Sequence, residues 1–131
     1  MLSAAQIMTT DMTTIRPDAS IQEAIDTLLD VGISGLPVTD DQGHLVGVIT
    51  EFALLAIAYD SNVQHQTVAQ HMTKEVITVD VDEPVNRVAD LCIVHRVRRV
   101  PVMKNGTLVG LMSRRDGLRA LFEAERPVCT A

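Results

Sequence analysis

The sequence predicts an α+β protein made of two β-α-β-β-α units that pack sheet to sheet with pseudo-twofold symmetry. The chain matches itself at an offset of 64 residues, which aligns Met8 with Met72 and Pro37 with Pro101. Each copy has one apolar stripe with the period of an α-helix. Each copy also has two short strand-like runs joined by a tight turn. These observations indicate an internal duplication with one fold per copy.

The repeat sets the expected domain boundaries, which are residues 1–58 for repeat 1 and 67–123 for repeat 2. Between them, residues 59–66 are predicted to form a polar linker, and residues 124–131 a C-terminal tail. A chain of 131 residues is long enough to bury a core.

Each repeat is expected to open with a short strand, "TTIR" at 13–16 and "ITVD" at 77–80. A helix follows, with a capping-box pattern of Ser20 and Glu23 in repeat 1 and Pro84 in the first turn in repeat 2. Its apolar stripe repeats at i, i+3, i+4, i+7 and i+8 in both copies. The stripes consist of Ile21, Ala24, Ile25, Leu28 and Leu29, and of Val85, Val88, Ala89, Cys92 and Ile93.

Two strands and a second helix complete each repeat. The hairpins are predicted in "LPVTDDQGHLVGVIT" and "VPVMKNGTLVGLMS", and Asn105-Gly106 is a strong signal for a two-residue turn. The closing helices are expected from about Glu51 and about Arg114. Their segments "EFALLAIAY" and "RRDGLRALF" carry apolar faces, which predicts a homodimer.

Composition disfavours several classes of function. The chain has 11 Lys+Arg against 17 Asp+Glu and only 2% aromatic residues, which disfavours nucleic-acid partners. The longest apolar run is too short to cross a bilayer, so no membrane partner is expected. The chain shows no signal-peptide pattern, and its two cysteines form no framework, which predicts a reduced, cytoplasmic setting. The four histidines lack ligand spacing, which predicts no metal site. Without a nucleophile–base pair or P-loop, the chain is expected not to be an enzyme.

The two repeats resemble a known family. "GISGLPVTDDQGHLVGVIT" and "HRVRRVPVMKNGTLVGLMSRRD", each preceded by an "MT…T[IV]" strand, are similar to the cystathionine-β-synthase (CBS) domain, over residues 3–122. A tandem pair of such domains is called a Bateman module. The resemblance implies two clefts at the pseudo-twofold interface that bind adenosyl ligands such as AMP, ADP, ATP or S-adenosylmethionine. It also implies that the module regulates another protein.

The run "GLMSRRD" is the strongest candidate for ligand contact. Gly110 would allow a ligand to approach the backbone, and Ser113 with the helix amides would donate to an anion. Asp116 can accept two hydrogen bonds from ribose hydroxyls. The resemblance likewise implies a ribose contact for Asp116 and a position near ribose or phosphate for Ser113. A simple capping box remains the alternative. Repeat 1 keeps Thr50 but has Ala53 in place of the aspartate, which predicts a weaker site.

Arg98 and Arg99 align with Ser34 and Gly35, so this basic pair is an addition to the repeated scaffold. Guanidinium groups suit phosphate, and the resemblance implies phosphate contact here. A salt bridge across a dimer interface is the alternative. His95 and Arg96 instead lie at an expected helix end, whose dipole favours cations.

The remaining walls of the two predicted sites come from strand residues. They would give backbone hydrogen bonds to adenine and apolar contacts to its ring, although core packing explains the apolar ones equally well. These residues are Thr14, Ile15, Arg16, Leu36 and Pro37 in repeat 1, and Thr78, Val79, Asp80, Val100 and Pro101 in repeat 2.

The sequence thus predicts a regulatory module that senses an adenine nucleotide or adenosyl ligand and signals in trans to an unknown effector protein. It requires no cofactor other than this regulatory ligand. A structural dimerisation module with empty clefts is the main alternative. A nucleic-acid-linked regulator and a small nucleotide-processing enzyme are further rivals.

Overall fold

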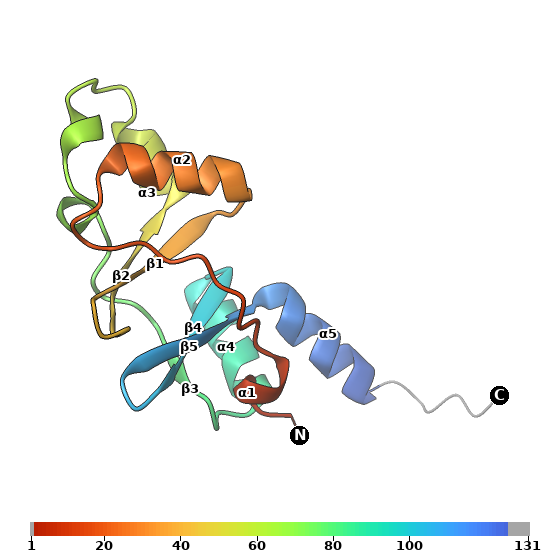
Figure 1. The fold of residues 1–131 in the computed structure, drawn as a ribbon. Coiled ribbons are helices and arrows are strands. Elements are labelled where there is room, and N and C mark those ends of the chain that lie inside the picture. Colours follow the sequence, from red (N-terminus) through yellow and green to blue (C-terminus); the bar gives the residue numbers. More distant parts are fainter. Residues whose placement is uncertain (1, 126–131) are drawn as a thin grey trace. The chain divides into compact units, whose positions relative to one another are not determined.

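The computed structural model describes residues 2–125 of the chain (Figure 1). Each repeat shows the predicted helix, two-strand hairpin and closing helix, while α1 and the two 3-10 turns were not predicted. The elements are α1 (Ala4–Ile7), α2 (Ile21–Val31), β1 (Gly35–Thr39), β2 (Leu45–Thr50), α3 (Glu51–Ile57), the 3-10 turns η1 (Val63–His65) and η2 (Val68–Gln70), β3 (Val79–Asp80), α4 (Val85–His95), β4 (Arg99–Lys104), β5 (Thr107–Ser113) and α5 (Arg114–Glu125). No helix in this part of the chain has the length and apolarity needed to cross a membrane.

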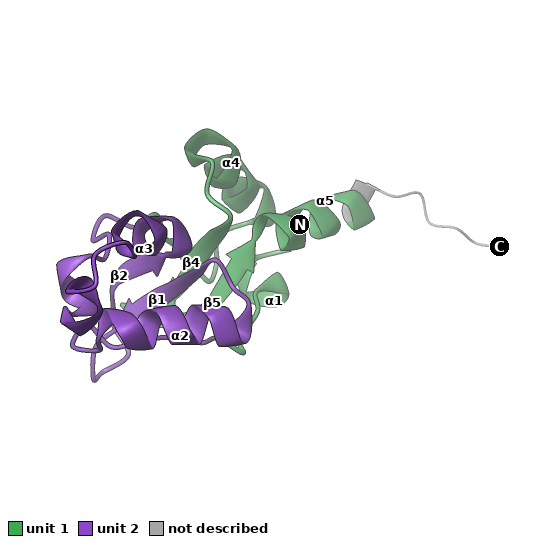
Figure 2. Cartoon of the chain, turned by 90° about the horizontal axis from the view of Figure 1, so that it is seen from above, with its two compact units in different colours: residues 1–12, 77–131 green, residues 13–76 purple. Residues whose placement is uncertain are grey.

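The chain divides into two compact units that differ from the sequence repeats (Figure 2). Unit 1 comprises residues 1–12 and 77–131, and unit 2 comprises residues 13–76. The first residues of repeat 1 therefore pack with repeat 2, and residues 67–76 of repeat 2 pack with repeat 1. Each unit is the body of one repeat completed by the leading segment of the other.

Matching hydrogen bonds hold the exchanged segments in the two units. In unit 1, Thr9 N donates to Leu111 O at 2.8 Å, and Leu111 N donates back to Thr9 O at 2.9 Å. In unit 2, Thr73 and Val48 form the same reciprocal pair at 2.8 and 2.9 Å. Each leading segment thus adds a backbone pair to the outer edge of a hairpin. The duplication therefore extends to individual backbone contacts.

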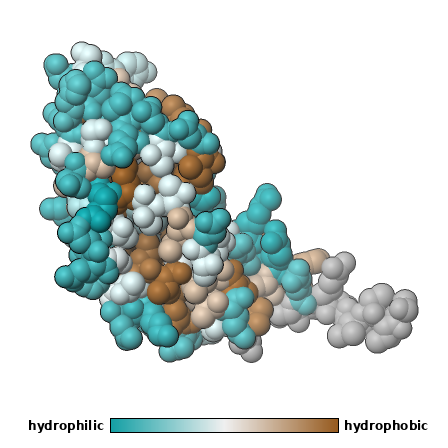
Figure 3. Space-filling view, in the orientation of Figure 1, coloured by the Kyte–Doolittle hydropathy of each residue, from teal (hydrophilic) through white to brown (hydrophobic). Residues whose placement is uncertain are grey.

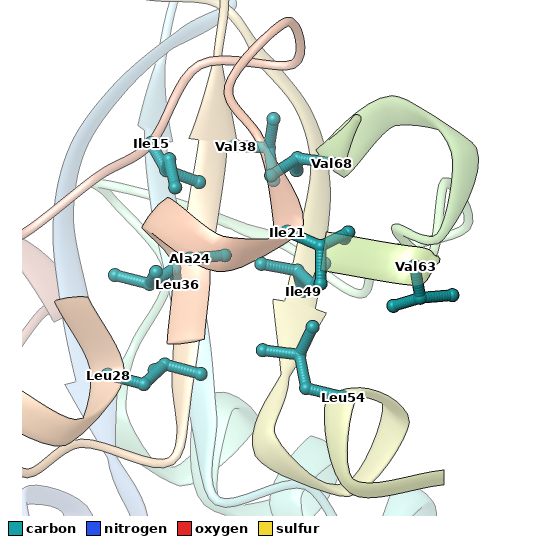
Figure 4. Close-up of a cluster of buried hydrophobic side chains, with 10 residues drawn as sticks. All are labelled: Ile15, Ile21, Ala24, Leu28, Leu36, Val38, Ile49, Leu54, Val63 and Val68. Atoms are coloured by element: carbon teal, nitrogen blue, oxygen red, sulfur yellow. The ribbon is translucent and has the colours of Figure 1, made fainter. Parts of the chain in front are cut away.

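Helix α2 and the β1–β2 hairpin enclose the core of unit 2, shown in Figure 4. Ser20 caps the helix as predicted, because its Oγ accepts from the backbone N of Glu23 at 3.1 Å. The helix ends at Val31, and its C-cap residue Gly32 has a φ of 74°, which favours glycine. The buried core side chains of unit 2 are Ile15, Ile21, Ala24, Leu28, Leu36, Val38, Ile49, Leu54, Val63 and Val68.

The opening strand predicted at 13–16 is wrong in extent, because it is reduced to one bridge. Ile15 pairs in parallel with Val38, with Ile15 N donating to Pro37 O at 3.0 Å. Pro17 follows directly and has no N–H to extend the ladder. In unit 1 the equivalent strand β3 is two residues long and lies parallel to β4 in the sheet order β3-β4-β5.

Helix α4 covers the sheet of unit 1 and begins one position later than the sequence suggested. Pro84 is the N-cap residue and not part of the first turn. The helix ends at His95, and its C-cap residue Arg96 has a φ of 55° where repeat 1 has glycine. Asn105 and Gly106 also have positive φ values of 52° and 81°, as the predicted two-residue turn of the β4–β5 hairpin requires.

The segment predicted as a polar linker packs into unit 2. Val63 of η1 is a buried member of the core, and Gln66 O accepts from Ile21 N at 2.8 Å. The polar residues around Val63 masked this contribution, because a single apolar residue gives no periodic signal.

Candidate functional site

The start of α5 is held by a reciprocal capping box. Ser113 N donates to Asp116 Oδ2, and Asp116 N donates to Ser113 Oγ, both at 3.0 Å. The two side chains are half-buried. Both were predicted as ligand contacts, with capping as the alternative, and the structure shows the capping role directly. A carboxylate has more acceptor positions than this box uses, so Asp116 can still accept from a ligand hydroxyl.

The structure brings Arg98 and Arg99 to this same helix start. Arg99 pairs with Ser113 across the β4–β5 hairpin, and Arg98 O accepts from Arg114 N at 2.8 Å. Both arginines are exposed, and neither forms an ion pair within residues 2–125. Four of the predicted site residues of repeat 2 therefore gather within unit 1. Two guanidinium groups that form no ion pair within residues 2–125 are chemically suited to bind an anion.

The remaining site residues of repeat 2 lie along the neighbouring strands. Val79 pairs with Val102 in the parallel β3–β4 register and is buried, whereas Thr78 and Asp80 are exposed. Val102 is three residues from Arg99 along β4, which corresponds to roughly 10 Å. Val100 and Pro101 are buried in the core between these points.

The proposed role of Gly110 needs correction. A Cβ at this position would overlap the side chain of Met8, so that side chain occupies the space assigned to a ligand. At Gly47 a Cβ would lie 2.7 Å from Met72 Sδ and 2.8 Å from Thr73 O. The glycines therefore accommodate the exchanged leading segments. The sequence pattern could not distinguish these two uses, since both require the same close approach.

Repeat 1 has a simpler version of the helix start. Thr50 Oγ1 accepts from Ala53 N at 3.2 Å, and the alanine cannot return a hydrogen bond. Leu36 and Pro37, predicted to face the ligand, are buried, and Leu36 belongs to the core of unit 2.

Arg16, a candidate in repeat 1, forms an ion pair with Asp41 of the β1–β2 turn. Asp40 orders this turn, because its Oδ1 accepts from His44 N at 2.9 Å and Gln42 N at 3.0 Å. The hydrogen bond from His44 N is the main reason that the pKa of Asp40 lies below its ordinary value. The turn therefore positions a carboxylate that neutralises Arg16.

Unit 2 also has a polar depression of about 360 Å³ beside Arg16. Sequence reasoning found three of its lining residues and missed the other four. The spacing of Glu23 and Thr27 along α2 could have indicated two of them. Its lining residues are Thr14, Ile15, Arg16, Asp18, Ala19, Glu23 and Thr27.

Residues 2–125 contain no group of three His, Cys, Asp or Glu side chains suited to a metal ion. Cys92 is a free, buried thiol, and its burial raises its pKa, with the nearby Arg114 acting weakly in the opposite direction. Cys129 lies outside the described residues.

Two sequence relatives place the chain in context. An uncharacterized 17.7 kDa protein of Acidianus ambivalens is 33% identical over 91% of this chain and 73% of its own length. An uncharacterized protein of Methanocaldococcus jannaschii is 29% identical over 88% of this chain. The chain spans only 41% of that second relative.

Solved structures with the same fold include two with adenosyl ligands. CBSX2, a CBS-pair protein from Arabidopsis thaliana solved in complex with AMP, has a TM-score of 0.86 and 27% identity, covering 96% of this chain and 100% of that chain. The CBS domain pair of protein MJ0100, solved with 5-methylthioadenosine and S-adenosyl-L-methionine, has a TM-score of 0.80 and 30% identity, covering 96% of this chain and 99% of that chain. The CBS domain model matches residues 4–60 and 68–123 of the sequence. The chain therefore belongs to the CBS domain family and carries two CBS domains in tandem.

Proposed function

We propose that this chain is a regulatory module that binds an adenine nucleotide or related adenosyl ligand, with repeat 2 providing the stronger site. The candidate ligands are AMP, ADP, ATP and S-adenosylmethionine. Similar CBS pairs have been solved with AMP and with S-adenosyl-L-methionine, which supports this ligand class.

The observation that carries the proposal is the cluster at the start of α5. Arg98 and Arg99 are exposed and unpaired within residues 2–125, beside the capping box of Ser113 and Asp116. Phosphate oxygens fit the two guanidinium groups, whose charge-assisted hydrogen bonds are stronger than neutral ones. The remaining acceptor capacity of Asp116 fits the vicinal hydroxyls of a ribose.

The proposal assigns a weaker nucleotide site to repeat 1. Ala53 cannot accept from a ribose, and Ser34 and Gly35 stand where repeat 2 has two arginines. Arg16, which lines the polar depression of unit 2, already pairs with Asp41. A phosphate there would have to compete with a carboxylate for this arginine.

The regulated protein is a separate effector, and the module itself performs no catalysis under this proposal. Ligand binding can change the effector only through a difference in affinity between two states of the module. The exposed apolar residues Phe52, Leu55 and Leu118 support homodimerisation. A cytoplasmic location remains a prediction from the sequence.

The second candidate function is a structural dimerisation module without a ligand. The same exposed helix residues favour it, because they need a partner whether or not a nucleotide binds. The two candidates differ in one measurable respect, which is the response of the folded chain to adenosyl ligands.

A thermal unfolding screen with AMP, ADP, ATP and S-adenosylmethionine tests the proposal. A ligand at 100 times its Kd should stabilise the fold by about 2.7 kcal/mol. The variants Arg98→Gln and Arg99→Gln should reduce this shift for phosphate-bearing ligands, and Asp116→Asn should reduce it for every adenosyl ligand. Arg87→Gln, which removes an exposed arginine elsewhere in unit 1, is the matched control. The absence of a shift with all four ligands contradicts ligand binding and favours the structural module.

A further inference from the structure

Repeat 1 has one candidate cation for a ligand phosphate. Among its predicted site residues, only Arg16 carries a positive charge. The arginine pair of repeat 2 has no counterpart, because Ser34 and Gly35 stand at those positions. Guanidinium groups suit phosphate, since they form forked, charge-assisted hydrogen bonds with it. Phosphate binding in repeat 1 therefore depends on whether Arg16 is available.

The fold holds Arg16 against a carboxylate. Two backbone hydrogen bonds join the preceding residue to β1, since Ile15 N donates to Pro37 O at 3.0 Å and Thr39 N donates to Ile15 O at 2.9 Å. Asp41 follows two residues later, in the β1–β2 turn, and forms an ion pair with Arg16. A phosphate would therefore have to displace this carboxylate from the arginine.

The polar depression beside Arg16 adds negative charge. Its volume is about 360 Å³, and Asp18 and Glu23 are among the residues that line it. Both are exposed, and neither forms an ion pair within residues 2–125. Thr27 Oγ1 donates to Glu23 O at 2.8 Å, so this hydroxyl oxygen has only acceptor positions left for a ligand. Figure 3 shows many hydrophilic residues on the visible face of unit 2. Such a lining repels an anion and favours groups that donate hydrogen bonds or carry positive charge.

Repeat 2 differs in its cations. Its leading strand is acidic, because Asp80 stands at the position of Arg16. Arg98 and Arg99, however, form no ion pair within the described part of the chain, residues 2–125. A phosphate thus has two unpaired arginines available in repeat 2 and one paired arginine in repeat 1. The two repeats are therefore suited to ligand groups of different charge.

We propose that repeat 1 selects adenosyl ligands without a phosphate, and that Asp41 sets this specificity by neutralising Arg16. This inference rests on the adenosyl binding of the proposed function and names the ligand class of the weaker site. The favoured ligands have an uncharged or cationic group in place of the phosphate, such as the thioether of 5′-methylthioadenosine or the sulfonium of S-adenosylmethionine. AMP is disfavoured, because its phosphate carries nearly two negative charges at neutral pH.

Backbone amide signals of the isotope-labelled full chain can locate each ligand by NMR. AMP, 5′-methylthioadenosine and S-adenosylmethionine share an adenosine and differ in charge, so they form a matched series. Amides at 14–19 report on repeat 1, and those at 113–116 report on repeat 2. The two phosphate-free ligands should shift the signals of repeat 1, whereas AMP should shift those of repeat 2. At repeat 1, AMP should bind at least about fivefold more weakly than 5′-methylthioadenosine.

The outcomes separate this inference from the proposed function. No shift in either repeat with any of the three ligands contradicts adenosyl binding, and this inference fails with it. AMP that binds repeat 1 as tightly as 5′-methylthioadenosine overturns this inference alone. The same holds if ligands bind repeat 2 while the phosphate-free ones leave the amides at 14–19 unchanged.

Asp41→Asn tests the residue that sets the specificity. It removes the charge that neutralises Arg16 and keeps the size of the side chain. The Kd of AMP at repeat 1 should fall about two- to fivefold, the modest effect expected of an exposed ion pair, while that of 5′-methylthioadenosine stays the same. Asp30→Asn is the matched control, because it makes the same change at an exposed carboxylate of α2 that does not line the depression. An equal gain for AMP in both variants overturns the role of Asp41.

A double variant tests whether the effect passes through the arginine. In Arg16→Gln, the further substitution Asp41→Asn should no longer improve AMP binding at repeat 1, because the cation that it would release is absent. A gain that persists in the double variant would mean that Asp41 acts by general repulsion, and the proposed mechanism would be wrong. Unfolding curves of all the variants show whether any change in Kd reflects a loss of the fold.

Discussion

Ser113 and Asp116 are joined at the start of α5 by two hydrogen bonds of 3.0 Å. In each bond, the backbone N of one residue donates to the side chain of the other. At the equivalent place in repeat 1, Thr50 Oγ1 accepts one such bond from Ala53 N at 3.2 Å. The alanine side chain has no acceptor with which to bond Thr50 N. The residue that makes repeat 2 the stronger candidate for ribose binding therefore also stabilises its helix. A loss of binding in a variant of Asp116 must be separated from a loss of stability.

Ala53→Asp should stabilise the chain by completing the capping box in repeat 1. The new carboxylate would accept from Thr50 N and would place negative charge at the N-terminus of α3. We expect an increase of about 0.5–1 kcal/mol in the free energy of unfolding, measured by urea titration. Ala53→Asn, which keeps an acceptor without the charge, is the control. A decrease with aspartate would mean that Thr50 N is inaccessible to this side chain.

Gly110→Ala should destabilise the chain by about 1–3 kcal/mol, because its Cβ overlaps the side chain of Met8. The three nearest atoms at this site belong to that one side chain, so the second substitution Met8→Ala should recover part of the loss. The free energy of unfolding of the double variant measures this recovery.

Gly47→Ala provides a contrasting case. Its Cβ would meet Met72 Sδ and also the backbone oxygen of Thr73 at 2.8 Å. Met72→Ala should therefore rescue Gly47→Ala less than Met8→Ala rescues Gly110→Ala. Equal rescue at both sites would contradict the tight approach of the Thr73 backbone.

Arg96→Gly should stabilise the isolated chain by about 1 kcal/mol, because glycine adopts the left-handed conformation without a Cβ penalty. Chemical unfolding at concentrations below the dimer Kd measures this effect. Gly32→Ala, at the equivalent position in repeat 1, should destabilise the chain by a similar amount.

Cys92 should make stability fall at alkaline pH. Burial raises the pKa of its thiol above that in the unfolded chain, so the unfolded state loses its proton first as the pH rises. The contribution of this group is complete below the unfolded pKa and is lost as the pH rises through the folded pKa. In a Cys129→Ser background, Cys92→Ala should therefore show a shallower loss of unfolding free energy above about pH 8 than the parent. Parallel curves would mean that the thiol ionises equally in both states.

The repeated helices and hairpins could be predicted because their signals are local. The stripe in residues 21–29 predicts α2, and Asn105-Gly106 predicts a turn that needs two positive φ values. The resemblance to CBS domains is confirmed by the match to both repeats. The predicted site is a more mixed case. Arg98, Arg99, Ser113 and Asp116 do come together, while Gly110 accommodates Met8 in place of a ligand.

The sequence by itself determined the duplication, the α+β class, the loss of the acidic residue at Ala53 and the added basic pair in repeat 2. Each of these is visible in residue identities or short-range periodicity. Only the tertiary structure decided that the leading segments exchange between the units, that Val63 joins a core, and that Asp41 neutralises Arg16. These contacts join residues separated along the chain, and they depend on how packed elements fit together. Local propensity carries no information about such contacts.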